Sequence, residues 1–166
     1  MTKPNYRHFL KLFLKEETSP LIEEIREQES TRLRNVIDQG AQTPNEFFWF
    51  DTVDGKSVAI NLALLQGVHF LWEPSPLPPD VTRYEGSIVI ALLGRAQRIE
   101  THWTSPEQIY DFFTNLQHGP EVVPFHGFED EDGERLMFRA SEVVFTIAPL
   151  QVIEEGRVIA AEEDER

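Results

Sequence analysis

Two stretches of alternating sequence decide the fold: FFWFDTVDGKSVAIN at residues 47–61 and FHGFEDEDGERLMFR at residues 125–139. Each contains an Asp-Gly pair between two runs in which apolar side chains recur at every second position. Such a dipeptide between alternating runs is a strong signal for a β-hairpin, because Asp and Gly tolerate the positive φ angles of the tightest turns. The sequence therefore predicts two hairpins, 78 residues apart.

A third strand is predicted after each hairpin, ending near residues 72 and 148, so that each unit forms a three-stranded meander. When residues 47–70 are laid over residues 125–148, only four of the 24 positions are identical, among them both residues of the Asp-Gly pair. Two independent meanders would share the same alternation and the same turn. We therefore interpret the match as repeated architecture and leave open whether it arose by duplication.

Helices are predicted at three places. The clearest runs from Thr104 to about residue 118, since Thr104 and Pro106 suit its first turn and apolar residues then recur at helical spacing. Two more are predicted near the N-terminus, over residues 5–15 and 19–40, although Leu12 is an apolar residue on the polar side of the first.

Together these elements define an α+β protein, in which N-terminal helices are followed by antiparallel β meanders with a capped helix between the two similar three-stranded units. Two further strands, at residues 87–93 and 98–103, are predicted before that capped helix. The chain is predicted to divide into an N-terminal helical segment (1–42), a β-meander plus helix unit (43–118), a second β-meander packing on the first (119–153) and an acidic tail (154–166).

The order of the predicted elements resembles known small β folds. Two strands and a capped helix follow the first meander, an order similar to the second half of pleckstrin-homology-like folds, in which one C-terminal helix closes a sheet. The three-stranded units are similar in topology to Sm-like and SH3-like small barrels. Because folds of this kind host unrelated functions, the resemblance implies a small β module and no particular activity.

Composition narrows the class of protein. The 166 residues include no cysteine, which excludes disulfides and thiolate chemistry. The longest apolar run, at residues 88–93, is far shorter than the roughly 20 residues of a membrane-spanning helix. With no secretory signal at the N-terminus either, we expect a cytoplasmic protein without a transmembrane segment.

The net charge of −14 argues against nucleic acid as a partner. Residues 121–166 alone carry thirteen acidic and four basic side chains, a balance of −9. Because phosphate backbones are bound by Lys and Arg, we expect no DNA partner and regard RNA as disfavoured. An acidic surface of this kind favours solubility and protein partners.

No sequence motif for catalysis, phosphate binding or metal binding is present. None of the five histidines pairs with another at metal-binding spacing. We therefore expect no catalytic residue, no metal and no cofactor. An enzyme with a dispersed site, of which His102 and His126 could be members, is kept as an alternative.

Strand aromatics are the candidate interaction site. Residues 47–50 are four consecutive aromatics, and alternation places two on each face of the strand, so that the second pair has to be covered by a helix, by the other β unit or by another chain. The candidate interaction residues are Phe48, Trp49, Phe50, Trp72 and Trp103, with Trp49 as the expected anchor.

The first functional hypothesis is therefore a non-catalytic interaction, assembly or regulatory factor that binds a protein partner or itself, for example as a homodimer. The alternative is a small-barrel or pleckstrin-homology-like module that binds a small ligand, a lipid head group or RNA. That alternative requires a basic surface, for which Arg83, Arg95 and Arg98 are the clustered candidates.

Overall fold

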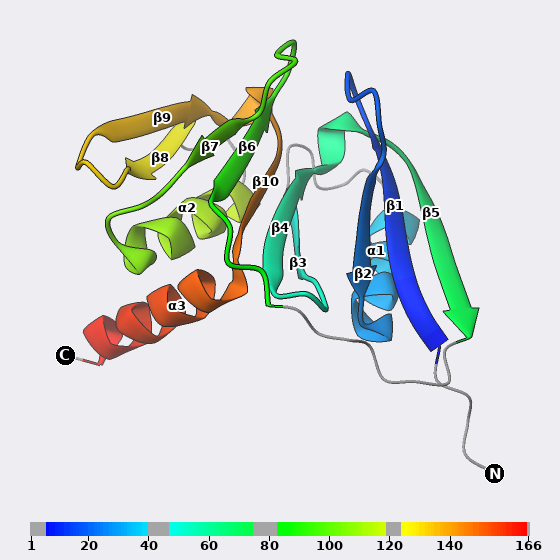
Figure 1. The fold of residues 1–166 in the computed structure, drawn as a ribbon. Helices are drawn as coiled ribbons and strands as arrows, with labels where there is room; N and C mark the ends of the chain where they lie inside the picture. Colours follow the sequence, from blue (N-terminus) through cyan, green and yellow to red (C-terminus); the bar gives the residue numbers. More distant parts are fainter. Residues whose placement is uncertain (1–5, 40–46, 75–82, 119–123, 166) are drawn as a thin grey trace.

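A computed structural model describes residues 6–39, 47–74, 83–118 and 124–165 and has a mixed α+β fold with antiparallel strands (Figure 1). The first half contains β1 (Tyr6–Leu14), β2 (Leu21–Ile25), α1 (Glu27–Asp38), β3 (Phe47–Asp51), β4 (Lys56–Asn61), the 3-10 turn η1 (Leu62–Leu64) and β5 (Leu65–Pro74). The second half contains β6 (Ile88–Leu92), β7 (Ile99–Thr101), α2 (Pro106–His118), β8 (Phe125–Glu129), β9 (Arg135–Arg139), η2 (Ala140–Glu142), β10 (Val143–Pro149) and α3 (Leu150–Asp164).

The order of elements is the same in the two halves, apart from the additional α3 at the end. Adding 78 to each residue number of the first half also reproduces the strand registers of the second half. Leu12 lies opposite Val68, and Ile90 lies opposite Thr146. All five residue pairs of the β3–β4 hairpin recur in β8–β9, from Phe47↔Asn61, which becomes Phe125↔Arg139, onward. The structural repeat therefore extends over β1–β5 and β6–β10, far beyond the hairpins.

Irregular features of the backbone repeat as well. The pairing of β1 with β5 is bulged beside Phe13, and the pairing of β6 with β10 is bulged at the corresponding point. Gly55 and Gly133 both have positive φ, as the hairpin turns require. The turn after β1 places Glu16 at φ 66°, and the corresponding turn after β6 places Gly94 at φ 75°. Such details are not general properties of meanders, and they identify the two halves as copies of one fold.

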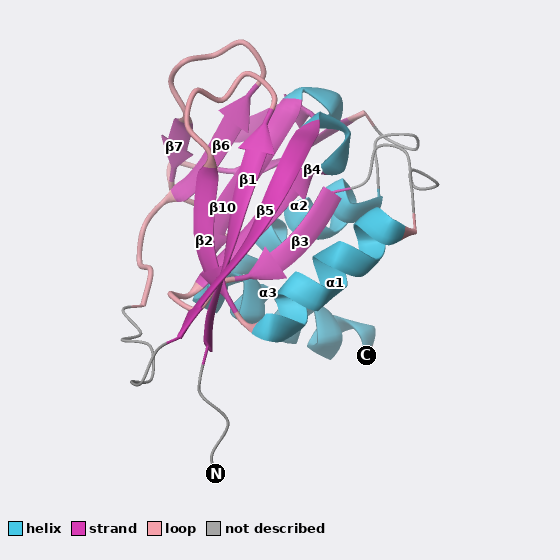
Figure 2. Cartoon of the chain, turned by 90° about the vertical axis from the view of Figure 1, so that its right-hand side faces the viewer, coloured by secondary structure: helices cyan, strands magenta, loops and turns pink. Residues whose placement is uncertain are grey.

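The two repeats are joined in one sheet. The strand order is β2-β1-β5 in a three-stranded sheet, β3-β4-β10-β6-β7 in a five-stranded sheet, and β8-β9 in a separate hairpin. The five-stranded sheet thus combines the β3–β4 hairpin of the first repeat with the β10-β6-β7 strands of the second. In Figure 2 the three-stranded sheet is seen from the side of the molecule opposite α2 and α3.

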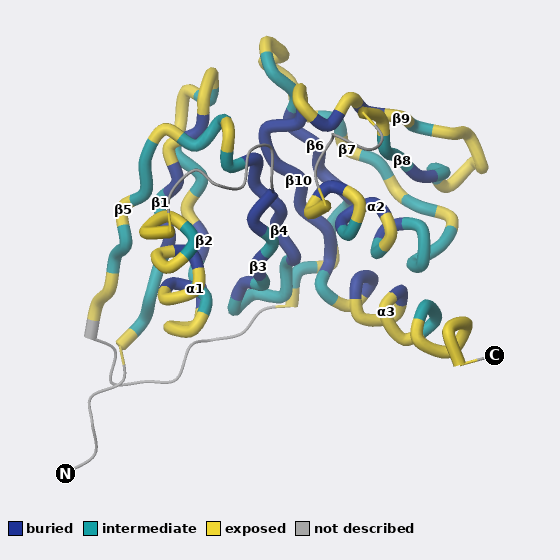
Figure 3. The backbone as a smooth tube through the Cα atoms, turned by 180° about the vertical axis from the view of Figure 1, so that it is seen from behind, coloured by how far each residue is buried: buried dark blue, intermediate teal, exposed yellow. Residues whose placement is uncertain are grey.

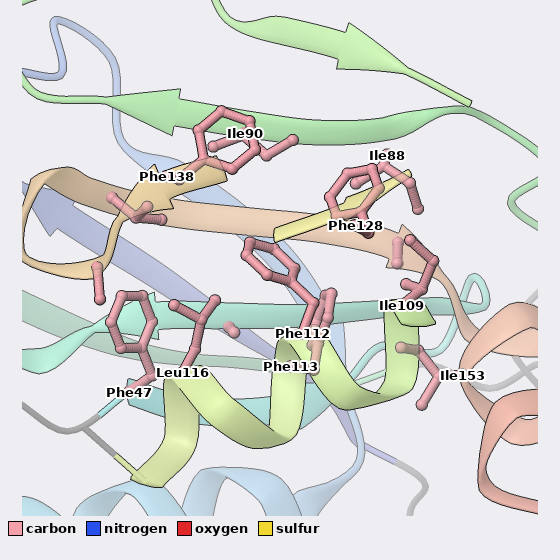
Figure 4. Close-up of a cluster of buried hydrophobic side chains, with 14 of the residues drawn as sticks. Phe47, Ile88, Ile90, Ile109, Phe112, Phe113, Leu116, Phe128, Phe138 and Ile153 are labelled. Atoms are coloured by element: carbon pink, nitrogen blue, oxygen red, sulfur yellow. The ribbon is translucent and has the colours of Figure 1, made fainter. Parts of the chain in front are cut away.

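Each repeat has its own hydrophobic core, and the five-stranded sheet separates the two. Alternate residues of β4 face opposite cores, since Val58 lies in the first and Ala59 in the second. The second core is rich in aromatic side chains from α2 and the β8–β9 hairpin (Figure 4), and the rings of Phe112 and Phe128 lie 5.3 Å apart, edge to face.

Several sequence-based predictions are confirmed. The two hairpins with Asp-Gly turns are present as β3–β4 and β8–β9. The two strands before the capped helix are β6 and β7, and the helix itself is α2, with Ile109, Phe112, Phe113 and Leu116 buried. The predicted α+β class is therefore correct at the level of composition and of these elements.

The prediction of an N-terminal helical segment is wrong over most of its length. Residues 6–14 form strand β1, in which Leu10, Leu12 and Leu14 alternate into the first core. Leu12, which does not fit the helical stripe, is the residue that distinguishes the two periods. The second predicted helix begins only at Glu27, because the apolar residues that precede it belong to β2.

The three-stranded meanders are also wrong as sheet topology. In both repeats a 3-10 turn follows the hairpin and redirects the chain, so the third strand does not pair with the second. β5 pairs with β1, and β10 pairs with β6 and β4. The acidic tail from residue 154 continues α3, whose buried residues Val152, Ile153 and Gly156 pack it against the second core.

The repeat predicts a stabilising substitution at Glu16. A side chain in the left-handed region costs about 1–2 kcal/mol, and the counterpart residue, Gly94, is free of that cost. Glu16 is exposed, so Glu16→Gly should raise the free energy of unfolding by about 0.5–1 kcal/mol after allowing for the greater freedom of glycine in the unfolded chain. Denaturant unfolding measures this change in free energy. In the other repeat, Gly94→Ala should lower the free energy of unfolding by about 1 kcal/mol. A loss of stability for Glu16→Gly would contradict the prediction.

Candidate interaction interface

The strand contact that joins the two repeats is the pairing of β4 with β10, which we call the seam. Its strands are antiparallel, with Ile60 opposite Phe145 and Val58 opposite Ile147. At one end the Asn61 side-chain amide donates a 3.0 Å hydrogen bond to the Val143 carbonyl, and its Oδ1 accepts one from the backbone N–H of Ala63. The seam lies in the interior of the protein, because every residue of β10 is buried.

The seam occurs once, although the repeat contains both of its strands twice. The counterpart of β4 is β9, and the counterpart of β10 is β5. Among the residues that the structure describes, β5 pairs only with β1, and β9 pairs only with β8. Within the same described residues, the outer edges of β2 and its counterpart β7 are both unpaired, and so are the outer edges of β3 and its counterpart β8. Only β5 and β9 lack a strand that their counterparts have.

The strands of the seam are also more buried than their counterparts β5 and β9. In Figure 3, β4 and β10 are dark along the middle of the molecule, whereas β5 and β9 lie on its opposite sides and are largely half-buried or exposed. Three exposed large apolar side chains have a counterpart in the other repeat that is buried in one of the two cores. With the exposed fraction of each, these pairs are Met137 (49%) and Ala59 (0%), Phe125 (39%) and Phe47 (4%), and Phe13 (40%) and Ala91 (2%).

These residues define two surfaces. The β9 face comprises Phe125, Arg135, Met137 and Arg139 together with the outer edge of β9. On it, Phe125 lies opposite Arg139, whose guanidinium lies 4.4 Å from the centre of the phenyl ring. The alternate residue Phe138 points the other way, into the second core. The β9 face is thus an apolar surface with two cations.

The β5 face comprises Lys11, Phe13 and His69 together with the outer edge of β5. Lys11 lies opposite His69, and its Nζ lies 5.8 Å from the centre of the Phe13 ring. These side chains alternate with Leu10, Leu12 and Leu14, which are buried, so they project from the outer side of the three-stranded sheet. The counterparts of Lys11 and His69 are Val89 and Ile147, both packed in the first core.

The predicted interaction residues lie in several different environments. Phe48 and Phe50 are buried in the first core. Trp49 is half-buried, with its ring centre 5.5 Å from that of Phe113 on α2, so a helix supplies the cover that the sequence left open. Trp103 packs against the second core. Only Trp72 is well exposed, at the end of β5 with its ring against Tyr6. An interaction role for these five residues stays a prediction.

The residues of the two faces were missed by sequence reasoning. From the sequence, Phe125 and Met137 are ordinary members of the second predicted hairpin, and Phe13 lies in a predicted helix. The available signal was the 78-residue offset itself, which pairs Phe13 with Ala91 once it is extended to the N-terminus. Between the halves, however, few residues outside the hairpins are identical, so the offset becomes convincing only with the registers.

A buried ion pair lies at the other end of the seam. Lys56 Nζ is 3.1 Å from Glu23 Oε2 and 3.2 Å from Asp54 Oδ2. Burial raises the pKa of Glu23, and attraction by Lys56 opposes the rise. Burial acts to lower the pKa of Lys56, but Glu23 and Asp54 outweigh it and the pKa is raised. The counterparts of Glu23 and Lys56 are Thr101 and Glu134, so this buried ion pair exists in the first repeat alone.

Two observations bear on a metal or ligand site. Within residues 6–39, 47–74, 83–118 and 124–165, three or more His, Asp or Glu side chains nowhere gather in a geometry that could hold a metal ion. An open hollow of about 640 Å³ on the surface of α1 is lined by Arg26, Glu27, Gln28, Thr31, Arg32 and Asn35. Arg32 is engaged there by Glu29 and by the carbonyl of Trp49, so the hollow is bounded by structural contacts.

Comparison of the chain with models of protein families, with curated proteins and with solved structures finds no match. Among the described helices, none is both long enough and apolar enough to span a bilayer. Inference about function therefore starts from the two faces.

The Glu23–Lys56 pair predicts a pH-dependent effect of Lys56→Met. Removing the cation leaves a buried carboxylate without its partner, which should cost about 3 kcal/mol of unfolding free energy at neutral pH. A carboxyl group whose folded pKa is raised binds its proton more readily in the folded state, so the cost should shrink as the pH is lowered toward 5. Urea unfolding of the variant and the unmodified protein at several pH values measures the difference.

The double variant Glu23→Gln, Lys56→Met is the control, because it removes both charges. It should recover most of the loss and its difference from the unmodified protein should vary little with pH. If Lys56→Met alone lost the same unfolding free energy at every pH, the loss could not be assigned to the unpaired Glu23 carboxylate.

Proposed function

We propose that the protein is a non-catalytic interaction protein that binds other protein surfaces through the β5 and β9 faces at the ends of its two-repeat array. One observation carries the proposal. Phe13, Phe125 and Met137 are exposed at positions whose counterparts are buried within the chain, so each end presents a surface of the type that the fold elsewhere covers with protein.

The chemistry of the two ends fits protein binding. An unpaired strand edge offers a row of N–H and C=O groups to an additional strand, and the adjacent apolar side chains add specificity. Native proteins protect exposed edges with charge or distortion, and the β9 face carries Arg135 and Arg139 for that purpose when it is unoccupied.

The alternative of a module for lipid head groups or RNA has less support. Arg98 is 3.8 Å from Glu17 and lies over the ring of Phe145, so its charge is partly neutralised. Arg95 is exposed, and so is Arg83, which lies beside Gly55 of the β3–β4 turn. Supporting contacts for a phosphate site are therefore fewer than those for a protein surface.

Affinity capture from the cells that produce the protein tests the proposal. Met137→Asp places a charge at the centre of the β9 face, where the side chain is exposed, so folding should be preserved. Val158→Asp is the matched control, since Val158 is similarly exposed but lies on α3. Proteins bound through the β9 face should be retained by the unmodified chain and by Val158→Asp and lost with Met137→Asp.

The proposal is contradicted if all three proteins capture the same set, or if none captures anything above an untagged control. Circular dichroism and unfolding curves that coincide for the three proteins are required, so that a loss of capture reports on the surface. Phe125→Asp should reproduce the effect of Met137→Asp, because Phe125 belongs to the same face.

A further inference from the structure

The repeat indicates which protein binds the β5 and β9 faces. This inference rests on the proposed function, in which both faces bind protein. In the seam, β4 of the first repeat pairs with β10 of the second. If the second repeat of one chain contacted the first repeat of another chain in the same way, β9 would take the place of β4. The β5 strand of the other chain would take the place of β10. We infer that the protein associates head to tail with a second copy of itself, through β9 of one chain and β5 of the other.

The register of this contact is fixed by the seam. Ala59 lies opposite Thr146, so Met137 is expected opposite Val68 of the next chain. Val58 lies opposite Ile147, so Leu136 is expected opposite His69. The strands run antiparallel in both cases, and directly opposed residues in such pairs have Cα atoms about 4.5–5.5 Å apart.

The second core is open on the side where a further repeat would lie. In the first core Val58 is fully buried, because Phe145 and Ile147 of the second repeat close it. Its counterpart in the second core, Leu136, is only half-buried. Leu92 is also half-buried, whereas its counterpart in the first repeat, Leu14, is buried. The three-stranded sheet of another chain would supply Phe13 and His69 at the places that Ala91 and Ile147 occupy in the first core.

Polar groups at the β9 edge are compatible with the same contact. Asn61 holds the seam by donating to a β10 carbonyl, and Arg139, its counterpart, is likewise a donor. Arg139 is exposed and lies over Phe125, so it can reach a partner strand without losing a buried contact. The corresponding acceptor is the carbonyl of Leu65, at the start of β5 in the next chain.

A contact of this kind joins two different surfaces, and that property distinguishes it from a symmetric dimer. Each chain has one β9 face and one β5 face, so association continues until the ends meet in a ring or grows as an open array. Blocking one face leaves the other functional. Two chains blocked at different faces can therefore still join once.

Complementation between purified variants tests the inference. Met137→Asp blocks the β9 face, and His69→Asp blocks the β5 face by placing a carboxylate opposite Leu136; both side chains are exposed in the single chain. In sedimentation velocity, the unmodified protein and Val158→Asp should associate with rising concentration. Each blocked variant alone should associate about tenfold more weakly or worse, and an equimolar mixture of the two should form a 1:1 heterodimer and stop there.

Disulfide capture checks the register. The natural chain contains no cysteine, so Met137→Cys and Val68→Cys introduce the only thiols. Mixed under oxidising conditions, these two variants should form a disulfide-linked heterodimer, whereas Val158→Cys mixed with Val68→Cys should not.

The outcomes separate the two proposals. A protein that stays monomeric at all concentrations, or variants that associate regardless of Met137 and His69, would overturn head-to-tail association. If capture from cells nevertheless depended on Met137, the proposed function would stand with a different protein as the partner. A mixture of blocked variants that fails to form a heterodimer, while the unmodified protein associates, would indicate a symmetric contact and also overturn the inference.

Discussion

The pairing of β4 with β10 is the interaction on which the rest of the structure depends. It closes the first core with residues of the second repeat and places the β3–β4 hairpin on a sheet with both faces buried. Without this pairing, the two sets of alternate side chains on β4 would no longer both face a hydrophobic core. The protein is therefore two copies of one fold that share a sheet, and neither copy has an interior that is complete without the other.

The same pairing creates the asymmetry of the molecule. A tandem pair joined head to tail has one satisfied contact and two unsatisfied ends, whatever its sequence. Terminal repeats of such arrays normally carry polar outer surfaces. Here the ends combine Lys11, His69, Arg135 and Arg139 with exposed Phe13, Phe125 and Met137. This mixture suits a surface that is stable in water and still able to bind protein.

Sequence reasoning captured the local elements and missed how they combine. The two Asp-Gly turns and the capped helix α2 were predictable because a few residues determine each of them. β1 was not, because the apolar spacing of residues 6–14 fits both a helix and a strand except at Leu12. The sheet topology depends on the 3-10 turns at Leu62–Leu64 and Ala140–Glu142, which have no strong local signal. The two faces could not be found before the topology was known, since their significance lies in a comparison between repeats.

The seam also affects how the chain is made. β4 ends at Asn61 and β10 ends at Pro149, so most of the second repeat is synthesised before β4 can meet its partner. At roughly 5–20 residues per second, the interval on the ribosome lasts about 4–18 s. During this time the β4 segment of the nascent chain has no β10 segment to pair with. On a crowded message, β5 of a neighbouring nascent chain carries the same backbone pattern as the missing β10, so two unfinished chains have a route to pair with each other before either is complete.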